Sequence, residues 1–379
     1  MNPYDFVPLD LSQPPEQRKP IWHHVLTPDA AQPGKLYSGY LYLDIKAETP
    51  LFIRDPDSPV QDPRHPGQHI RNKQGETIIP GPSIKGLVRS VVETLCRGCL
   101  TGYEGKHILY HAPAPFSPCQ DNTRLCISCR LFGMMARQRN AQVFLGKVSA
   151  EDALVYKDTH KLYEPIYTAV LDAPKPRHRA FYLNPQGVIA GRKFYFHQDE
   201  PRTVERLVPI RTSPGEYRNQ YIQPLRSGTW FSARLNFSRL ESDEFAALLL
   251  ALTLETDMRH KLGYGKPIGL GSISIEVAEM CLVDYAARYT NFRAGSSNGI
   301  TSYELSAMQT LLGEQMASFD EQLHAAWKRF SAQQALRHLH EIWEWPPDPS
   351  VEYSYPSKGW FESNKQARIA ATRDLYPGD

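Results

Sequence analysis

Apolar and polar positions alternate in some segments of the chain and recur at helical spacing in others. In the segment 39–53, polar or aromatic residues alternate with Leu41, Leu43 and Ile45, which predicts a strand. The same reasoning predicts strands over 142–148, 229–237 and 272–278. Apolar residues recur every three or four positions in four further segments, and this spacing predicts helices over 84–95, 241–258, 305–312 and 319–343.

A Pro-Gly-Pro turn at 80–82 joins a short apolar run to the first predicted helix. Ser83 stands where the helical pattern begins, and it is expected to be the N-cap. Lys85 and Arg89 share a face near the start of this helix, where free N–H groups and cations suit a phosphate. The alternative is an ordinary capped helix with a solvated basic face.

Length and charge exclude several classes of protein. The chain has 379 residues and a formal net charge of +2, so a surface for nucleic acid must be local. No uninterrupted apolar run is long enough to span a bilayer, and the polar, Pro-rich start does not resemble a signal peptide. These features predict a cytoplasmic protein that does not bind membranes.

Five of the six cysteines fall between Cys96 and Cys129, and without a secretory signal such clusters are metal ligands more often than disulfides. Four thiols suit a closed, structural Zn²⁺ site, whereas an H-E-x-x-H helix for catalytic zinc is absent. The alternative is a group of reduced, buried thiols. The expected ligands are Cys99, Cys119, Cys126 and Cys129, with Cys96, His107 and His111 as alternatives to the fourth ligand.

The segment 157–226 carries five more Lys and Arg residues than Asp and Glu residues, and aromatic residues are interleaved with the basic ones. Cations for phosphates and flat rings for bases suit single-stranded nucleic acid. The alternative is a twisted hairpin with an aromatic core and a solvated basic face. The candidate RNA-binding residues here are Lys175, Arg177, Arg179, Arg192 and Lys193.

A glycine-rich loop at 261–271 follows a predicted helix and precedes a strand. A dinucleotide-binding fingerprint needs glycines between a strand and a helix, so this order excludes it. Because glycines have no side chain, those around Lys261 and Lys266 would let the backbone of an RNA approach closely. The glycines concerned are Gly263, Gly265, Gly269 and Gly271.

An acidic loop over 54–77 follows the first strand. A carboxylate of Asp55, Asp57 or Asp62 could hold a divalent ion or orient a ribose hydroxyl during RNA cleavage. The alternative is ordinary loop polarity beside prolines.

Four segments together resemble the RAMP superfamily, whose members form the backbones of CRISPR effector complexes. Residues 79–90 are similar to the family's I-P-G-S-S-[IL]-K-G-x-[LV]-R-S, and residues 126–133 to its C-x-x-C-R-L-F-G. The segments 146–153 and 261–271 resemble the next strand and the glycine-rich loop. The segments 174–183 and 191–195 resemble a narrower type III branch, related to the single-chain type III effectors.

The resemblance implies an α+β fold with a ferredoxin-like (RRM-like) core over 39–284. In this division, 1–38 form an N-terminal arm and 285–379 a mostly helical C-terminal extension. The core then includes the acidic loop at 54–77, a zinc-binding insertion at 96–130 and a β-hairpin "thumb" at 157–226.

The resemblance also implies a backbone subunit of a type III effector that binds crRNA, complementary target RNA and other subunits of the complex. Residues 57–60, Asp-Ser-Pro-Val, are the nearest match to the family's Asp-Asn-Pro-Val. Asp57 is therefore the expected cleaving residue, with a divalent cation such as Mg²⁺, and Asp55 and Asp62 are its alternates. The other functions to be tested are RNA binding without cleavage, and metal-independent processing of precursor crRNA.

Overall fold

The structure is a computed structural model of the 379-residue chain. In the described part, no helix is long and apolar enough to cross a membrane. The described residues are 2–23, 35–57, 65–101, 112–136, 142–169, 171, 182–183, 187–199, 211–213, 216–217, 219–290, 299–313, 315–355 and 363.

The centre of the fold is a curled antiparallel sheet, in which β3 (Tyr37–Ala47) lies between β15 (Trp230–Leu240) and β17 (Ser272–Val283). The alternation in the sequence decides which face is buried: Leu41, Leu43 and Ile45 are fully buried, and the polar or aromatic residues that alternate with them are half-buried or exposed. The strand predicted over 39–53 is confirmed as far as Ala47, where β3 ends, and residues 48–53 follow it as a loop.

The strand order across the sheet is β16-β17-β3-β15-β9-β4, with β8 also paired to β15 and β18 paired to β17. All of these pairs are antiparallel. The outer strands are short, with bounds β4 (Ile78–Ile79), β8 (Val148–Ala150), β9 (Ala153–Val155), β16 (His260–Lys261) and β18 (Ile300–Glu304).

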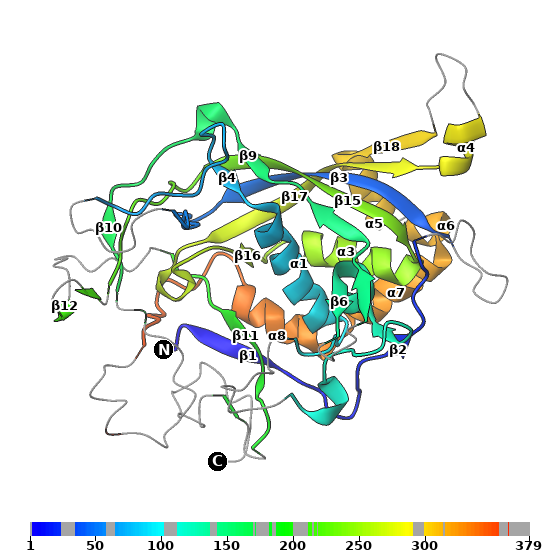
Figure 1. Ribbon diagram of the computed structural model, residues 1–379, viewed down its shortest axis with the longest axis horizontal. Helices are drawn as coiled ribbons and strands as arrows, with labels where there is room; N and C mark the ends of the chain where they lie inside the picture. The colour runs from blue at the N-terminus through cyan, green and yellow to red at the C-terminus, as the bar shows by residue number, and fades with distance from the viewer. Residues whose placement is uncertain are drawn as a thin grey trace.

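Two helices, α1 (Gly81–Leu95) and α3 (Ser242–Thr253), cover one face of the sheet and pack against each other (Figure 1). Each helix connects two strands of the sheet: α1 runs from β4 to the segment that leads to β8 and β9, and α3 runs from β15 to β16 and β17. Their apolar sides form the main core with the inner face of the sheet.

The first turn of α1 differs from the prediction for Ser83, which is wrong as an N-cap. The helix begins at Gly81 with Pro80 as N-cap, and no side chain of the cap residue bonds to the first turn. Proline fits the first helical turn, where an N–H is not needed, so Pro82 is taken into the helix. Asp152, just before β9, closes this end instead, because its Oδ1 accepts a hydrogen bond from Gly81 N at 2.8 Å.

The N-terminal residues, expected to form an arm, pair with the body of the protein. Strand β1 (Tyr4–Pro8) is antiparallel to β11 (Gly191–Tyr195), and β2 (Gln17–Arg18) pairs with β5 (Leu125–Cys126). Val7 is buried in the main core. The arm is therefore a structural part of the fold over these two strands.

The described part of the segment 157–226 contains β11 and two short strand pairs. Strand β10 (Ile166–Tyr167) pairs with β14 (Tyr221–Ile222), and β12 (Arg211–Ser213) pairs with β13 (Glu216–Tyr217). The rings of Tyr167 and Tyr221 are stacked at 4.4 Å. Lys175, Arg177 and Arg179 lie outside the described residues, and the thumb stays a prediction.

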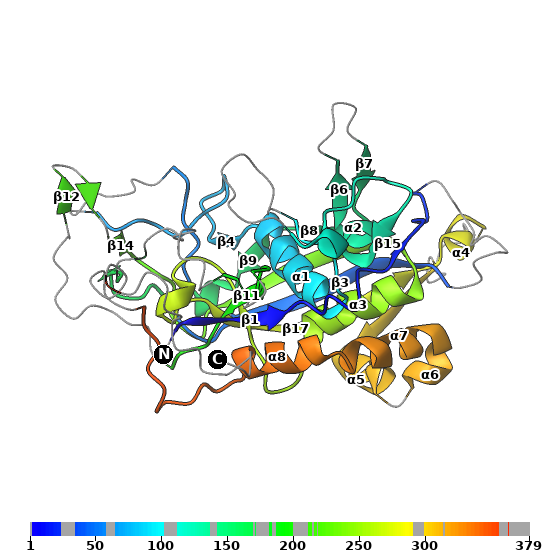
Figure 2. The ribbon, with the colours of Figure 1, turned by 90° about the horizontal axis from the view of Figure 1, so that it is seen from below.

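The C-terminal segment is mostly helical where the structure describes it, but it also supplies β18 to the sheet, which the sequence pattern did not predict. Helix α7 packs on α3, and α8 packs on α1 and β1 (Figure 2). The bounds of its helices are α4 (Tyr285–Thr290), α5 (Leu305–Leu312), α6 (Met316–Phe319), α7 (Glu321–Ser331) and α8 (Gln334–Trp343).

Candidate functional site

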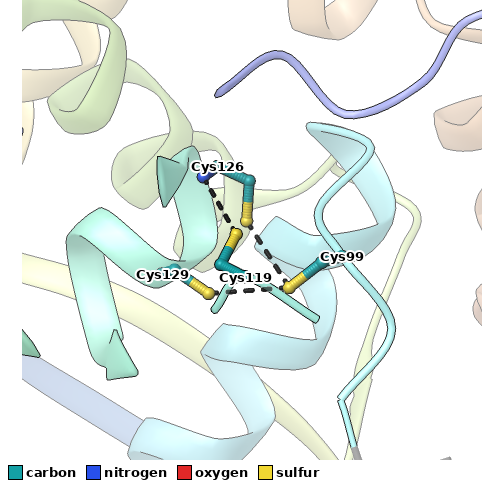
Figure 3. A group of neighbouring side chains, drawn as sticks. All are labelled: Cys99, Cys119, Cys126 and Cys129. Carbon is teal, nitrogen blue, oxygen red and sulfur yellow. Dashed lines mark hydrogen bonds between the residues drawn. The ribbon is translucent and has the colours of Figure 1, made fainter. Parts of the chain in front are cut away.

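Four buried cysteines converge at the C-terminal end of α1 (Figure 3). Cys99 follows α1, Cys119 precedes the turn into β5, Cys126 ends β5, and Cys129 lies in α2 (Ile127–Phe132). One sulfur from each lies within 4.8 Å of the others. The sequence named these four residues, and the structure brings them together.

The sulfur spacing fits a metal held by thiolates. The Sγ atom of Cys99 lies 3.5 Å from that of Cys129 and 3.7 Å from that of Cys126, far beyond the length of a disulfide. Four Zn–S bonds of ~2.3 Å in a tetrahedron place the sulfurs about 3.8 Å apart. Hydrogen bonds from neighbouring thiols, first from Cys119, hold the pKa of Cys126 well below its usual value. The same thiol–thiol hydrogen bonds raise the pKa of Cys99 and Cys129, so the group favours one thiolate, at Cys126, the form that binds zinc.

Of the alternative ligands, only Cys96 lies among the described residues, and it does not join this group. Cys96 is half-buried beside the cluster but is not among its converging sulfurs, and burial raises the pKa of its thiol. His107 and His111 lie outside the described residues. Cys96 is therefore not the fourth ligand in the described part of the chain.

Glu93, in the last turns of α1, links the cysteine loop to the strand β11. Arg192 donates from Nη1 to Glu93 Oε2 at 3.0 Å and from Nη2 to the carbonyl oxygens of Gly98, at 2.6 Å, and Cys99, at 3.1 Å. Arg89 donates from Nε to Glu93 Oε1 at 2.9 Å. Both guanidinium groups, expected to face RNA, are thus paired with one buried carboxylate inside the fold.

The remaining basic residue of the α1 face is Lys85. It is half-buried, and burial, together with the charge of Arg89, lowers the pKa of its amine. The first N–H of the helix already bonds to Asp152, so a phosphate at this helix end would meet a carboxylate. Ser83 is half-buried in the same turn. The start of α1 is therefore a weaker anion site than the sequence predicted.

A second buried network fixes the C-x-x-C helix to the core. Arg130 of α2 donates from Nη1 to Glu244 at 3.0 Å and from Nη2 to Asp243 at 2.9 Å, both at the start of α3. Lys147 donates to both oxygens of Glu244, at 2.8 and 3.1 Å. Glu241 adds a third carboxylate at 2.8 Å from Arg130. The network holds α2, and with it Cys129, against α3.

The glycine-rich loop lies beside the loop that follows β3. Tyr264 N donates to Phe52 O at 2.8 Å, and Gly271 N donates to Pro50 O at 3.0 Å. Gly263 has φ +86°, and an added Cβ would lie 2.5 Å from Phe52 O. The close approach that requires a glycine here is thus to the protein's own backbone. The structure thus places the glycine-rich loop against residues 50–53, just before the acidic loop.

Three lysines gather at this loop with no carboxylate partner in the described part of the chain. Lys261 Nζ donates to Ser272 Oγ at 2.9 Å, Lys266 Nζ donates to Gly263 O at 2.9 Å, and Lys193 Nζ lies 3.7 Å from the centroid of the Tyr4 ring.

Burial and the charge of Lys266 lower the pKa of Lys261 to about 7 and that of Lys193 to about 8. Burial also lowers the pKa of Lys266. The charge of Lys266 thus acts on both of the other amines, and an anion bound there would stabilise their charged forms.

The acidic loop is described only in part. Asp57 is exposed, and its backbone N donates to Asp55 Oδ1 at 3.0 Å, a local turn. Asp62 lies outside the described residues. Neither Asp55 nor Asp57 belongs to a metal-ligating group within the described residues. The role of Asp57 stays a prediction.

Sequence reasoning missed the residues that hold the site together. Glu93 and Glu244 looked like ordinary charges of helices, and their partners are distant in the sequence. The two acids Glu241 and Glu244, three positions apart at a helix start, carried one available signal, because they form a capping box.

The comparisons with known proteins agree with the motifs. The family model of the RAMP superfamily matches residues 44–274, more than half of the chain, from β3 to β17. No curated protein matches it. The matched range includes the helix α1, the four cysteines and the glycine-rich loop. The chain therefore belongs to the RAMP superfamily.

Proposed function

We propose that this protein is an RNA-binding backbone subunit of a type III CRISPR effector complex, which holds crRNA and cleaves complementary target RNA. Membership of the RAMP superfamily is consistent with a CRISPR-associated RNA-binding role. The observation that carries the proposal is the group of three lysines without carboxylate partners in the described chain, on the glycine-rich loop and on β11.

This lysine group suits a phosphate backbone. Buried or half-buried amines without a counter-ion are costly for a fold, unless a bound anion offsets the cost. Two aromatic rings lie near Lys193 Nζ: that of Tyr195, half-buried, has its centroid 4.7 Å away, and that of Tyr4, 3.7 Å away, is buried in the fold. Cations beside aromatic rings are the combination that binds single-stranded RNA.

The core proposed for this function is ferredoxin-like. Along the chain the main elements run β3, α1, β9, β15, α3 and β17, and the corresponding strands lie in the order β17-β3-β15-β9. This is a βαββαβ unit with both helices on one face, which supports the proposed core. The acidic and glycine-rich loops then lie at one end of the central strands.

The four cysteines would hold a structural zinc ion in this subunit. Their thiolates would neutralise the ion and close it off from solvent. In this position the ion would join the end of α1 to β5 and α2, and Arg192 would carry the connection to β11 and Lys193.

Cleavage is assigned to Asp57, with Mg²⁺ or a similar cation. The support is its place on the loop that begins next to the glycine-rich loop. The alternative is a subunit that binds RNA without cutting it. Histidine-dependent crRNA processing has less support: His197 is 1 % exposed, and its two ring nitrogens are within hydrogen-bond distance of Ser272 Oγ and Arg259 O.

RNA binding is tested by removing charge from the lysine group. We expect Lys193→Gln with Lys266→Gln to weaken binding of single-stranded RNA and to lower the salt slope of log K by ~0.7 per lost phosphate contact. Fluorescence anisotropy at several salt concentrations measures both. Lys328→Gln on α7, an exposed lysine, is the matched control. Equal slopes for all proteins would contradict the proposed binding site.

Cleavage is tested in the assembled complex, with guide RNA and a complementary target. Asp57→Ala should remove one regularly spaced cut while the complex still assembles. If Asp57→Ala keeps the cut and Asp55→Ala or Asp62→Ala loses it, the cleaving residue is the aspartate whose replacement removes the cut. If no cut maps to this subunit, the non-cleaving function is the correct one.

A further inference from the structure

A second group of metal-ligating side chains lies far from the cysteines in the sequence. Glu255 and Asp257 are in the turn between α3 and β16, and His340 is in the C-terminal helix α8. His340 Nε2 lies 3.0 Å from Asp257 Oδ2, and His340 Nδ1 lies 3.5 Å from Glu255 Oε2. One ligand atom from each residue lies within 4.8 Å of the other two.

The contact between His340 and Asp257 is close but is not a hydrogen bond. Although the two atoms are 3.0 Å apart, Nε2 is buried and has no hydrogen-bond partner, so the carboxylate oxygen does not lie along its N–H direction. Two ligand atoms that each lie ~2.1 Å from one ion, with a tetrahedral angle at the ion, are about 3.4 Å apart. Their lone pairs then point at the ion. The spacing of this pair is thus close to that of two ligands of one ion.

Backbone hydrogen bonds hold the two elements in place. Arg259 N donates to Trp343 O at 3.1 Å, and Trp345 N donates to Asp257 O at 2.7 Å. The guanidinium of Arg259 pairs with Glu48 at 3.4 Å, so its charge has a carboxylate partner outside the group. The ligands are therefore brought together by the fold, and an ion would not have to order the chain.

We propose that Glu255, Asp257 and His340 form a second metal site, which binds a divalent transition-metal ion such as Mn²⁺ or Zn²⁺. One imidazole nitrogen and two carboxylates give a harder ligand set than four thiolates, so the two sites differ in the metals that they take. Because the two carboxylates are exposed, water completes the coordination and the ion exchanges with solvent.

The ion fastens the C-terminal helices to the core next to the lysine group. Asp257 is four residues before Lys261, at the start of the segment that leads into the glycine-rich loop. An ion shared between this turn and α8 therefore limits movement of that segment. The C-terminal extension gains a connection to the core that depends on metal.

Binding of Mn²⁺ distinguishes the proposed site from the four cysteines, because thiolates are poor ligands for this hard ion. The test uses the full-length protein with zinc already supplied, and electron paramagnetic resonance measures free Mn²⁺ during a titration. We expect one Mn²⁺ per chain beyond background, and at least tenfold weaker binding in His340→Gln and in Asp257→Asn. His338→Gln, two residues earlier on α8, is the matched control and should bind as the wild type does.

A thermal scan with and without Mn²⁺ gives the second readout, because a ligand that binds only the folded state raises the midpoint. The wild type and His338→Gln should gain stability, and His340→Gln and Asp257→Asn should not. Asp57→Ala should keep the effect, which separates this site from the acidic loop. Equal binding by the wild type and both ligand variants, or no binding by the wild type, would overturn the proposal.

Discussion

Replacing Glu244 by Gln tests the buried network that joins the C-x-x-C helix to α3. Glu244 is completely buried, and its side chain accepts two hydrogen bonds from Lys147 and one from Arg130. Arg130 keeps Asp243 and Glu241 as partners after the change, but Lys147, 3 % exposed, loses its only carboxylate in the described chain. The cost therefore falls on this buried amine and on the capping box, in which Glu241 N donates to Glu244 Oε2 at 3.0 Å.

Leaving one charge of a buried pair without its partner costs about 3–5 kcal/mol. We expect Glu244→Gln to lower the free energy of unfolding in urea by that amount. Replacing both partners, with Lys147→Met added to Glu244→Gln, removes the uncompensated charge and should recover most of the loss. Glu276→Gln, an exposed change on β17, is the control and should alter stability by less than ~0.5 kcal/mol.

A loss below about 1 kcal/mol in Glu244→Gln would refute the view that Lys147 depends on this carboxylate. The same follows if the double variant is no more stable than the single one. Zinc content measured on the same samples shows whether α2 still presents Cys129. Retained zinc with lowered stability would place the network in the core and not in the metal site.

Three further predictions use metal content and pH. Elemental analysis should find zinc in the wild type and in Cys96→Ser but not in Cys126→Ser; equal contents would exclude the proposed ligand set. Burial lowers the pKa of His260 from 6.5 to about 4, so the unfolded chain binds more protons between these values. Stability should then fall by about 3 kcal/mol as the pH drops from 6.5 to 4, and His260→Gln should remove this share in urea titrations. Because burial lowers the pKa of Lys261 to about 7 and of Lys193 to about 8, RNA affinity at fixed ionic strength should fall from pH 7 to 9; a flat profile would contradict phosphate binding there.

Local patterns predicted the parts of the fold that depend on local physics. The alternation over 39–53 covers most of β3, and the helical spacing over 241–258 contains α3. The spacing of the cysteines also named four thiols that converge in space. Period and spacing are read from neighbouring residues, so one sequence is enough for them.

Long-range pairing explains what the sequence could not predict. Arg192 carried the signature of an RNA contact, a cation among aromatic residues, but its partner Glu93 stands 99 positions earlier. Strand β1 is too short for a periodic signal, and its partner β11 is also far away in the chain. In the sequence, His340 belongs to an ordinary amphipathic helix, and only the fold brings it next to Asp257.

The pairing of distant strands also decides when this chain can fold. The central strand β3 pairs with β15 and β17, which begin at Trp230 and Ser272, and β1 waits for β11 at Gly191. During synthesis, the apolar faces of β1 and β3 therefore stay without their partners while about two hundred residues are added. During this time, these strands can pair with another chain. Slower translation before residue 283, where β17 ends, therefore extends the period in which the chain can aggregate.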